Sequence, residues 1–172
     1  MTNHKKRDTR PYKIIIDIHE KDNPISRNLY DKAGKANVEL KHETPYDPTG
    51  DYIVIDRDGT HWGFERKSFL DCWQSICSGR IDGQLAQLEA KYPDHAILML
   101  EAPNYFPKNL QPKSYIIKKT VMTFFNDRSL IMPCWYVLDA DHASNILIKF
   151  AKVAHRVEIS GRGLIIVRED ET

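Results

Sequence analysis

Two short apolar runs narrow the folds open to this chain more than any other feature: "YKIIIDI" (residues 12–18) and "HAILMLEA" (95–102). Runs of this length that are rich in branched aliphatic residues are typical of strands buried inside a sheet. Segments with helical spacing, such as "SFLDCWQSICS" and "SYIIKKTVMTFFNDR", lie between the strand candidates. Strands that alternate with helices predict an α/β fold, with a central mixed β-sheet flanked by helices.

Local signals predict where several helices begin. Asn23-Pro24 predicts a helix start, because asparagine can cap a helix and proline suits its first turn. Ser114 and Asp141 are the expected caps of two later helices. The segment 103–113 contains three prolines, so we expect it to lack regular structure.

The length of 172 residues suits one domain, expected over residues 12–172 and preceded by a flexible basic leader over 1–11. A last apolar run, "GLIIV" (163–167), predicts a late strand. The formal net charge is +1, so affinity for nucleic acid has to come from local clusters of basic side chains.

The same composition predicts where the protein works. No apolar run reaches transmembrane length, and the N-terminus lacks the hydrophobic core of a signal peptide. Three cysteines without a CxxC pair are typical of reduced thiols and argue against a zinc site. We therefore expect a protein with no membrane association, either cytoplasmic and associated with the nucleoid, or nuclear.

The stretch "HWGFERKSFLD" (61–71) carries three adjacent charges, Glu65, Arg66 and Lys67. In a strand, alternate residues share a face, so Glu65 and Lys67 point the same way and Arg66 points away. A carboxylate and an ammonium that face one spot suit a divalent cation held beside a phosphate. Surface strands often carry such charges without function, so the triplet alone is weak support for this chemistry.

A second carboxylate for such a metal would come from Asp51, on the other arm of a hairpin predicted over 51–67. A two-residue turn would place Asp51 opposite Arg66, whereas a three-residue loop over 57–59 would place it opposite Glu65. We predict the three-residue loop, with its glycine in the left-handed conformation, because this register also pairs large apolar side chains on the opposite face.

Further charged residues lie near this hairpin in the sequence. Ser68 and Asp71 have the spacing of a capping box, so a structural role for Asp71 is open. Arg80 follows a glycine expected to end a helix, where it could hold a phosphate or lie on the surface. Asp17 and Glu20 lie at the end of the first strand, and Glu20 could add a carboxylate to the metal site or cap the backbone.

The proline-containing segment 103–113 could contact nucleic acid. Its aromatic residues Tyr105 and Phe106 offer stacking surfaces, and Lys108 and Lys113 offer charges for phosphates. An ordinary surface loop is the alternative interpretation.

With these residues in view, "GDYIVI…FERKSFLDCWQSICSGRIDGQLAQL" strongly resembles the nuclease domain of the XPF/Hef family of structure-specific endonucleases, in the PD-(D/E)xK superfamily. The family hallmark is GD, a gap and then ERKxxxD, present here as Gly50-Asp51, Glu65-Arg66-Lys67 and Asp71. The resemblance covers roughly residues 12–155 and implies a restriction-endonuclease-like fold.

The resemblance implies roles residue by residue. Asp51, Glu65 and the backbone carbonyl of Arg66 would be metal ligands, Lys67 the catalytic lysine, and Glu20 would lie near this ion or a second one. Supporting or DNA-binding positions would be Asp17, Arg66, Asp71, Arg80, Lys108 and Lys113. The first strand of the family typically ends in VDxRE, and here His19 stands where arginine is usual, which alters whatever contact that arginine makes.

The implied activity is Mg²⁺-dependent hydrolysis of DNA, with Mn²⁺ able to substitute, on forks, flaps or junctions in repair or recombination. Family members usually continue into tandem helix-hairpin-helix modules that dimerise and grip duplex DNA, and the sequence contains no such pattern. A homodimer or a partner protein would then supply the grip, or the protein would act as a compact nuclease. A non-catalytic DNA-binding or scaffolding subunit is the alternative.

Overall fold

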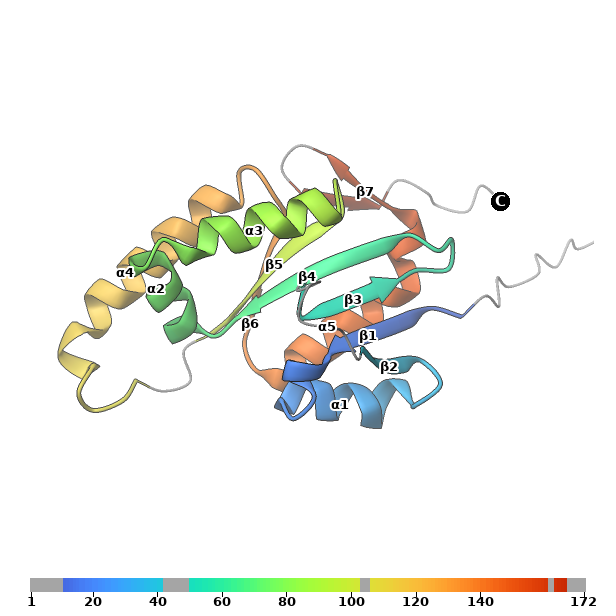
Figure 1. The fold of residues 1–172 in the computed structure, drawn as a ribbon, viewed down its shortest axis with the longest axis horizontal. Coiled ribbons are helices and arrows are strands. Elements are labelled where there is room, and N and C mark those ends of the chain that lie inside the picture. The colour runs from blue at the N-terminus through green and yellow to red at the C-terminus, as the bar shows by residue number, and fades with distance from the viewer. Residues whose placement is uncertain (1–10, 42–49, 103–105, 161–162, 167–172) are drawn as a thin grey trace, which may run out of the picture.

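A six-stranded mixed β-sheet forms the centre of the computed structural model, which describes residues 11–41, 50–102, 106–160 and 163–166 (Figure 1). The strands, in spatial order, are β2 (Val38–Lys41), β1 (Lys13–Asp17), β3 (Tyr52–Ile55), β4 (His61–Lys67), β5 (Ala96–Glu101) and β6 (Cys134–Val137). The predicted α/β class with a mixed sheet is therefore confirmed.

The strand directions bring distant parts of the chain to one edge of the sheet. β1 pairs parallel with β2 and antiparallel with β3, and β3 pairs antiparallel with β4. β4, β5 and β6 then run parallel to one another. The C-terminal ends of β1, β4 and β5 consequently meet the N-terminal end of β3, and the charged residues singled out above lie at these ends.

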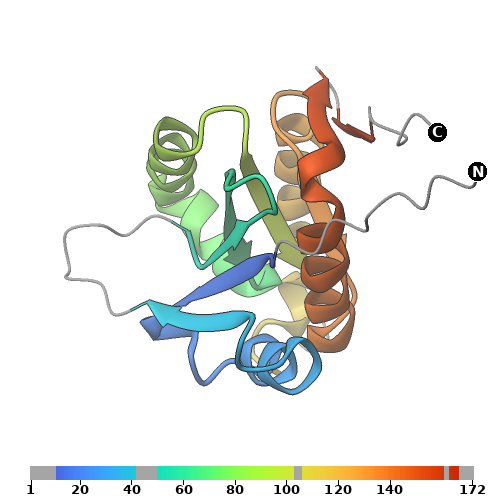
Figure 2. The ribbon, with the colours of Figure 1, turned by 90° about the vertical axis from the view of Figure 1, so that its right-hand side faces the viewer.

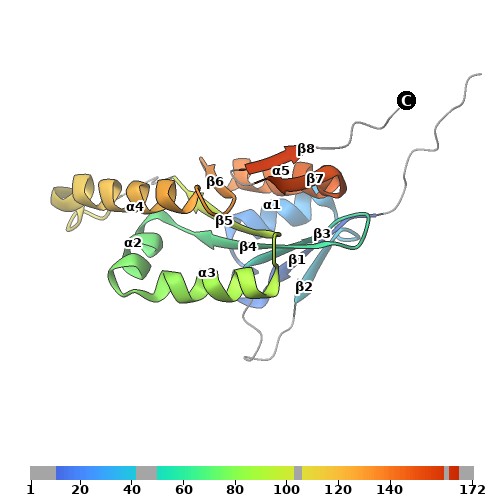
Figure 3. The same ribbon diagram turned by 90° about the horizontal axis from the view of Figure 1, so that it is seen from above.

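Helices cover both faces of the sheet (Figure 3). The helices on one face are α1 (Pro24–Ala33) and α5 (Ala140–Val153), and those packed against the other are α2 (Phe69–Cys77), α3 (Arg80–Lys91) and α4 (Ser114–Arg128). The sheet lies between α3 and α5 when the molecule is turned (Figure 2). β5 is buried on both of its faces, as the continuous apolar run 95–102 predicts.

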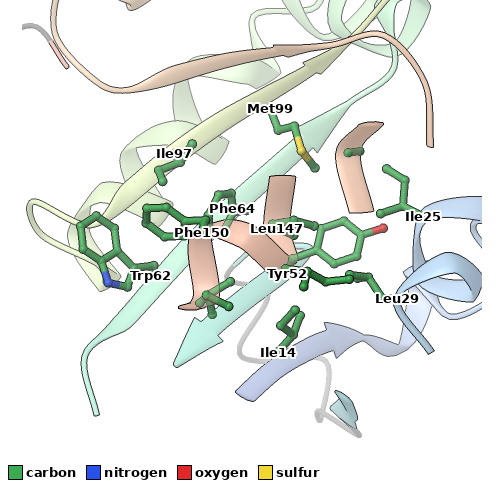
Figure 4. Packing of buried hydrophobic residues seen from close by; sticks show 14 of the residues in the cluster. Ile14, Ile25, Leu29, Tyr52, Trp62, Phe64, Ile97, Met99, Leu147 and Phe150 are labelled. Atoms are coloured by element: carbon green, nitrogen blue, oxygen red, sulfur yellow. The ribbon is translucent and has the colours of Figure 1, made fainter. Parts of the chain in front are cut away.

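Two hydrophobic clusters fill the spaces between sheet and helices. In the first, Tyr52, Trp62 and Phe64 from the hairpin pack against Leu147 and Phe150 of α5 (Figure 4). The second joins Leu98 and Leu100 of β5 to the buried sides of α2, α3 and α4. Burial on both faces fixes the positions of the strand ends that carry the charged residues.

The β3–β4 hairpin has the predicted three-residue register. The Asp56 backbone N–H donates to the Thr60 carbonyl at 3.0 Å, and Tyr52 pairs with Phe64. Gly59 has φ +86°, the left-handed conformation that this loop requires. The buried Asp56 carboxylate also accepts hydrogen bonds from the Asp58 and Thr60 backbone N–H groups and from the Trp62 indole, which stabilise the turn.

The expected cap at Asn23 is confirmed, because its side chain accepts a hydrogen bond from the Ile25 N–H. The cap predicted at Ser114 is wrong: a 3₁₀ turn, η2 (Gln111–Lys113), runs directly into α4, and Ser114 is the first α-helical residue. The same turn corrects the expectation that regular structure is absent up to residue 113. Pro112 lies in its first turn, where a missing N–H costs little.

The cap predicted at Asp141 is also wrong. Asp139 caps α5 by accepting a hydrogen bond from the His142 N–H at 2.8 Å. Asp141 lies inside the first turn, where its carboxylate pairs with Lys32 of α1 at 2.5 Å. Both aspartates can satisfy a cap, and the β6–α5 connection decides which one does.

The last two described strands, β7 (Val157–Ser160) and β8 (Gly163–Ile166), form an antiparallel pair separate from the central sheet. Two further short 3₁₀ turns are η1 (Ile18–Glu20) and η3 (Ala154–Arg156). The late strand predicted over 163–167 exists as β8, and its last predicted residue lies outside the described residues. Among the described helices, none has the length and apolar character needed to cross a membrane.

Candidate active site

Glu65 and Lys67 form a buried ion pair at the C-terminal end of β4. Their side chains share one face of the strand, and the Lys67 ammonium lies 2.7 Å from Glu65 Oε1. Glu65 is only 8% exposed and Lys67 only 5% exposed. A solvated edge would leave both charges in water, so the interpretation of this triplet as a solvated edge is wrong.

Asp51 lies beside this pair, directly before β3, and two hydrogen bonds fix its position. Its backbone N–H donates to the Phe64 carbonyl at 2.8 Å, and its Oδ2 accepts from the Arg66 backbone N–H at 2.7 Å. Burial raises the pKa of the Asp51 carboxyl well above its usual range, and the negative charges of Glu65 and Glu20 raise it further. Burial and the neighbouring carboxylates therefore both disfavour the ionised form of Asp51.

Lys67 remains a cation in this setting. Burial lowers the pKa of its ammonium, but the charge and hydrogen bond of Glu65, with the charges of Asp71 and Asp51, outweigh burial and raise the pKa above its usual value. Lys67 is consequently a hydrogen-bond donor and a positive charge at neutral pH, rather than a base.

The Arg66 side chain points to the opposite face, as strand alternation predicts. Its Nε and Nη2 donate to the two carboxylate oxygens of Glu101 at 2.8 Å each, and its Nη1 lies 3.4 Å from Glu20 Oε2. Burial lowers the pKa of Arg66, but the hydrogen bonds and charge of Glu101 raise it overall. This two-pronged pair ties the end of β4 to the end of β5.

Glu101 is the residue of this network that we did not select from the sequence. The available signal was its place at the end of the buried run "HAILMLEA". That signal identifies a strand end, but the register between parallel strands joined by a long connection cannot be read from spacing. The structure supplies it by pairing Arg66 with Met99, two residues before Glu101.

Glu20 lies close to this network but is occupied by other contacts. Its Oε2 accepts from Asn23 Nδ2 at 2.8 Å as well as approaching Arg66. Asp17 caps η1 by accepting from the His19 N–H at 2.8 Å, and His19 itself is exposed. Of the strand-end acids, Glu20 is thus near the Asp51 charge, whereas Asp17 has a capping role.

Asp71 and Arg80 extend the charge network along α2. Ser68 caps that helix, as predicted, by accepting from the Asp71 N–H at 3.2 Å. The Asp71 carboxylate, however, faces Lys67 at 3.6 Å and Arg80 at 3.3 Å, and Arg80 also donates to Ser75 Oγ at 2.9 Å. Asp71 therefore links the buried ion pair to a half-exposed arginine.

The segment after β5 lies against the same end of the molecule. The ring of Phe106 is 6.2 Å from that of Phe69, which opens α2, and Lys118 lies 5.5 Å above the Phe106 ring. Lys108 and Lys113 are exposed. Tyr105, named above as a stacking residue, lies outside the described residues.

The donor set at this edge suits a small, hard cation. Carboxylate and carbonyl oxygens are the ligands that Mg²⁺ prefers, and it usually keeps several waters. Asp51, Glu65 and the carbonyl of Arg66 could supply such oxygens, and a cation would offset the burial and the repulsion that raise the pKa of Asp51. Among the described residues, there is no group of three or more aspartate, glutamate, histidine or cysteine side chains that could hold a metal ion by themselves.

Two solved structures with a similar fold are both of XPF from Aeropyrum pernix. This chain is similar to XPF from Aeropyrum pernix in complex with DNA, at 19% identity and a TM-score of 0.61, over 85% of this chain and 66% of that one. A second structure, of XPF from Aeropyrum pernix, is similar at 19% identity and a TM-score of 0.60, over 84% of this chain and 65% of that one. The chain thus spans just under two thirds of those chains.

Among curated protein sequences, none matches this chain significantly. A family model described as the ERCC4 domain matches residues 16–147. That range includes the end of β1, all of β2 to β6, the buried Glu65–Lys67 pair and Asp51, and it is well over half of the 172 residues. The chain belongs to the ERCC4 domain family.

Proposed function

We propose that this protein is a Mg²⁺-dependent endonuclease that hydrolyses phosphodiester bonds in branched DNA. The observation that carries the proposal is the buried Glu65–Lys67 pair beside Asp51, where carboxylates and a fixed cation converge at one edge of the sheet. Membership in the ERCC4 domain family and the fold shared with a DNA-bound XPF support the same activity.

The proposed metal ligands are Asp51, Glu65 and the carbonyl of Arg66, with Glu20 near the same charge. When bound, the ion would act as a Lewis acid on the phosphate and lower the pKa of a coordinated water. Lys67, held as a cation by Glu65, would donate to the attacking water or to a phosphate oxygen and stabilise the negative charge that develops there.

The bond that breaks joins phosphorus to the 3′ oxygen. In-line attack by water would leave a 5′-phosphate and a 3′-hydroxyl. Arg80 would approach a neighbouring phosphate, because its half-exposed guanidinium already lies beside Asp71 and so beside Lys67. The Arg66 side chain would act only through its pairs with Glu101 and Glu20.

The test compares wild type with Glu65→Ala on labelled fork, flap, nicked and four-way DNA, with and without Mg²⁺ or Mn²⁺. We expect cutting that requires the ion and that falls at least about 100-fold in Glu65→Ala, since the variant loses a ligand and the partner of Lys67. Glu39→Ala is the matched control, because Glu39 is an exposed glutamate on the edge strand β2, where it pairs with Lys13 of β1. Tight binding without cutting under either ion would contradict the proposal and favour a non-catalytic DNA-binding subunit.

A further inference from the structure

In one segment of this chain, all the charged residues are basic. The whole sequence has 25 basic and 24 acidic residues, but the 25 residues from Ala102 to Asn126 contain no aspartate or glutamate. Four lysines lie in this segment: Lys108, Lys113, Lys118 and Lys119. All four are exposed, so the segment presents positive charge without local neutralisation by its own residues.

The first turn of α4, within this segment, exposes two large apolar side chains. Tyr115 is 75% exposed and Ile116 is 63% exposed, whereas Ile117 and Val121 on the inner side of the helix are fully buried. Packing inside the molecule therefore accounts for Ile117 and Val121 but not for Tyr115 and Ile116. Exposed apolar side chains that occur together are a common feature of surfaces that bind a partner.

The strand topology places this turn at the same end of the molecule as the candidate active site. Because β5 and β6 are parallel, the connecting α4 runs back against them and begins near the C-terminal ends of β4 and β5. The N-terminal end of α4 projects past α2 at the left of the molecule (Figures 1 and 3). The path from the site is short, since Phe69 follows Lys67 by two residues and its ring contacts Phe106.

Phe106 supports this surface instead of offering a free ring. It is half-buried, with Phe69 against it at 6.2 Å and the Lys118 ammonium above its ring at 5.5 Å. The ring left open for stacking in the described part of the segment is that of Tyr115. Phe106, one of the two candidate stacking residues named from the sequence, is therefore covered by other side chains.

We propose that Tyr115 and Ile116 form a ledge on which unpaired bases of branched DNA stack, while Lys113, Lys118 and Lys119 bind the phosphates of the same strand. Bases in duplex DNA cover one another, and only an unpaired strand offers the free base faces that an aromatic ring can stack on. The positive charge of the segment is complementary to the backbone of that strand. This proposal rests on the proposed nuclease function and assigns the surface that would hold an unpaired arm of the DNA.

The test measures DNA binding by fluorescence anisotropy in chelator, which prevents cutting, for wild type, Tyr115→Ala and Tyr115→Phe. The probes are a fork with unpaired arms and a duplex of equal length, and 2-aminopurine in the unpaired arm reports stacking. We expect Tyr115→Ala to weaken fork binding about tenfold and to abolish the change in 2-aminopurine fluorescence, with duplex binding within about twofold. Tyr115→Phe keeps the ring and should match wild type.

A paired charge test separates phosphate contacts from stacking. Lys113→Ala/Lys119→Ala should weaken fork binding and reduce the dependence of the binding constant on salt. Lys149→Ala/Lys152→Ala is the control, because it removes two exposed lysines from α5 on the other face of the sheet. Equal effects of the two pairs would contradict a role for this particular segment.

Three results would overturn the ledge. Fork binding unchanged in Tyr115→Ala, or fork and duplex binding reduced equally, would show that Tyr115 does not read unpaired bases. Loss of a dimer in light scattering on Tyr115→Ala, with unchanged DNA binding per chain, would assign the surface to a protein partner. Failure of the nuclease proposal has a different signature: fork binding that depends on Tyr115, with no metal-dependent cutting by wild type.

Discussion

Asp51 is held by hydrogen bonds in a position that disfavours the charged form of its own side chain. Its backbone is fixed by β4 and its Oδ2 by the Arg66 N–H, yet burial and the charges of Glu65 and Glu20 disfavour its ionised form. Without a bound cation, this carboxylate lowers the stability of the fold at neutral pH. Sites that bind ions often have this cost, because the same crowding of charge that destabilises the empty site attracts the ion.

Asp51→Asn tests this conflict directly. The folded-state pKa of Asp51 is raised, so the native state binds more protons than the unfolded state, and wild-type stability falls as pH rises from about 4 towards the folded pKa. Asparagine can still accept from the Arg66 N–H but carries no charge. In chelator we expect Asp51→Asn to melt about 2–4 °C above wild type at pH 7.5, with the gap closing as the pH falls towards 4.

The same melting experiment reads out metal binding. Adding Mg²⁺ should raise the melting temperature of wild type and leave Asp51→Asn nearly unchanged, because a ligand stabilises only the state that binds it. If Asp51→Asn is less stable than wild type at every pH, the charge of Asp51 does not destabilise the fold. If Mg²⁺ raises the melting temperature of Asp51→Asn as much as that of wild type, Asp51 is not a metal ligand.

Much of the site could be predicted from sequence because a hairpin has simple rules. Alternation separates Arg66 from Glu65 and Lys67, and the three-residue loop sets Asp51 against them. Glu101 could not be predicted, because it lies 35 positions after Arg66 and the register of β4 on β5 depends on the packing of α2 and α3, which lie between them in the sequence. The cap at Asp139 was missed because Asp139 and Asp141 are both aspartates, which cap helices equally well, and the sequence does not show which one precedes the first helical turn.

At the scale of elements, the Arg66–Glu101 pair joins the two strands that carry the site. Both side chains are mostly buried, at 20% and 17% exposure, so the pair is little screened by water. The exposed Lys13–Glu39 pair between β1 and β2 has 46% and 56% exposure and is screened far more. The two pairs therefore allow the contribution of a mostly buried salt bridge to stability to be compared with that of an exposed one.

Glu101→Ala should lower the free energy of unfolding by about 2–3 kcal/mol, because it leaves the Arg66 guanidinium sheltered without its main acceptor. Glu39→Ala should change it by less than about 0.5 kcal/mol. Urea denaturation of both variants gives the comparison. Similar small losses in the two variants would mean that the Arg66–Glu101 bridge does not hold β4 and β5 together.

At the scale of the whole molecule, the sheet connects two hydrophobic clusters that share its strands. Leu147 belongs to the cluster under α5, and Leu85 of α3 belongs to the cluster on the other face. Trp62 and Trp135 report on the first cluster, and Trp73 packs against the second. Since both clusters depend on the same strands, we expect the described core to unfold as one unit.

Leu147→Ala and Leu85→Ala should each destabilise the protein by about 2–5 kcal/mol and keep a single transition. Tryptophan fluorescence and far-ultraviolet circular dichroism should give coincident unfolding curves for both variants. Separate transitions, with one face melting before the other, would contradict a shared core. The α/β class was predictable because helices and strands alternate, whereas the separate β7–β8 hairpin was not, since short apolar runs do not reveal their partners.

The order in which the site residues occur along the chain has a consequence for synthesis. Glu20 leaves the ribosome 81 positions before Glu101, and Asp51, Glu65 and Lys67 emerge between them. Until β5 has been made and docked, Arg66 lacks its main acceptor and the end of β4 has no partner strand on that side. A nascent or partly degraded chain would therefore carry Glu65, Arg66 and Lys67 without the geometry on which the proposed function depends.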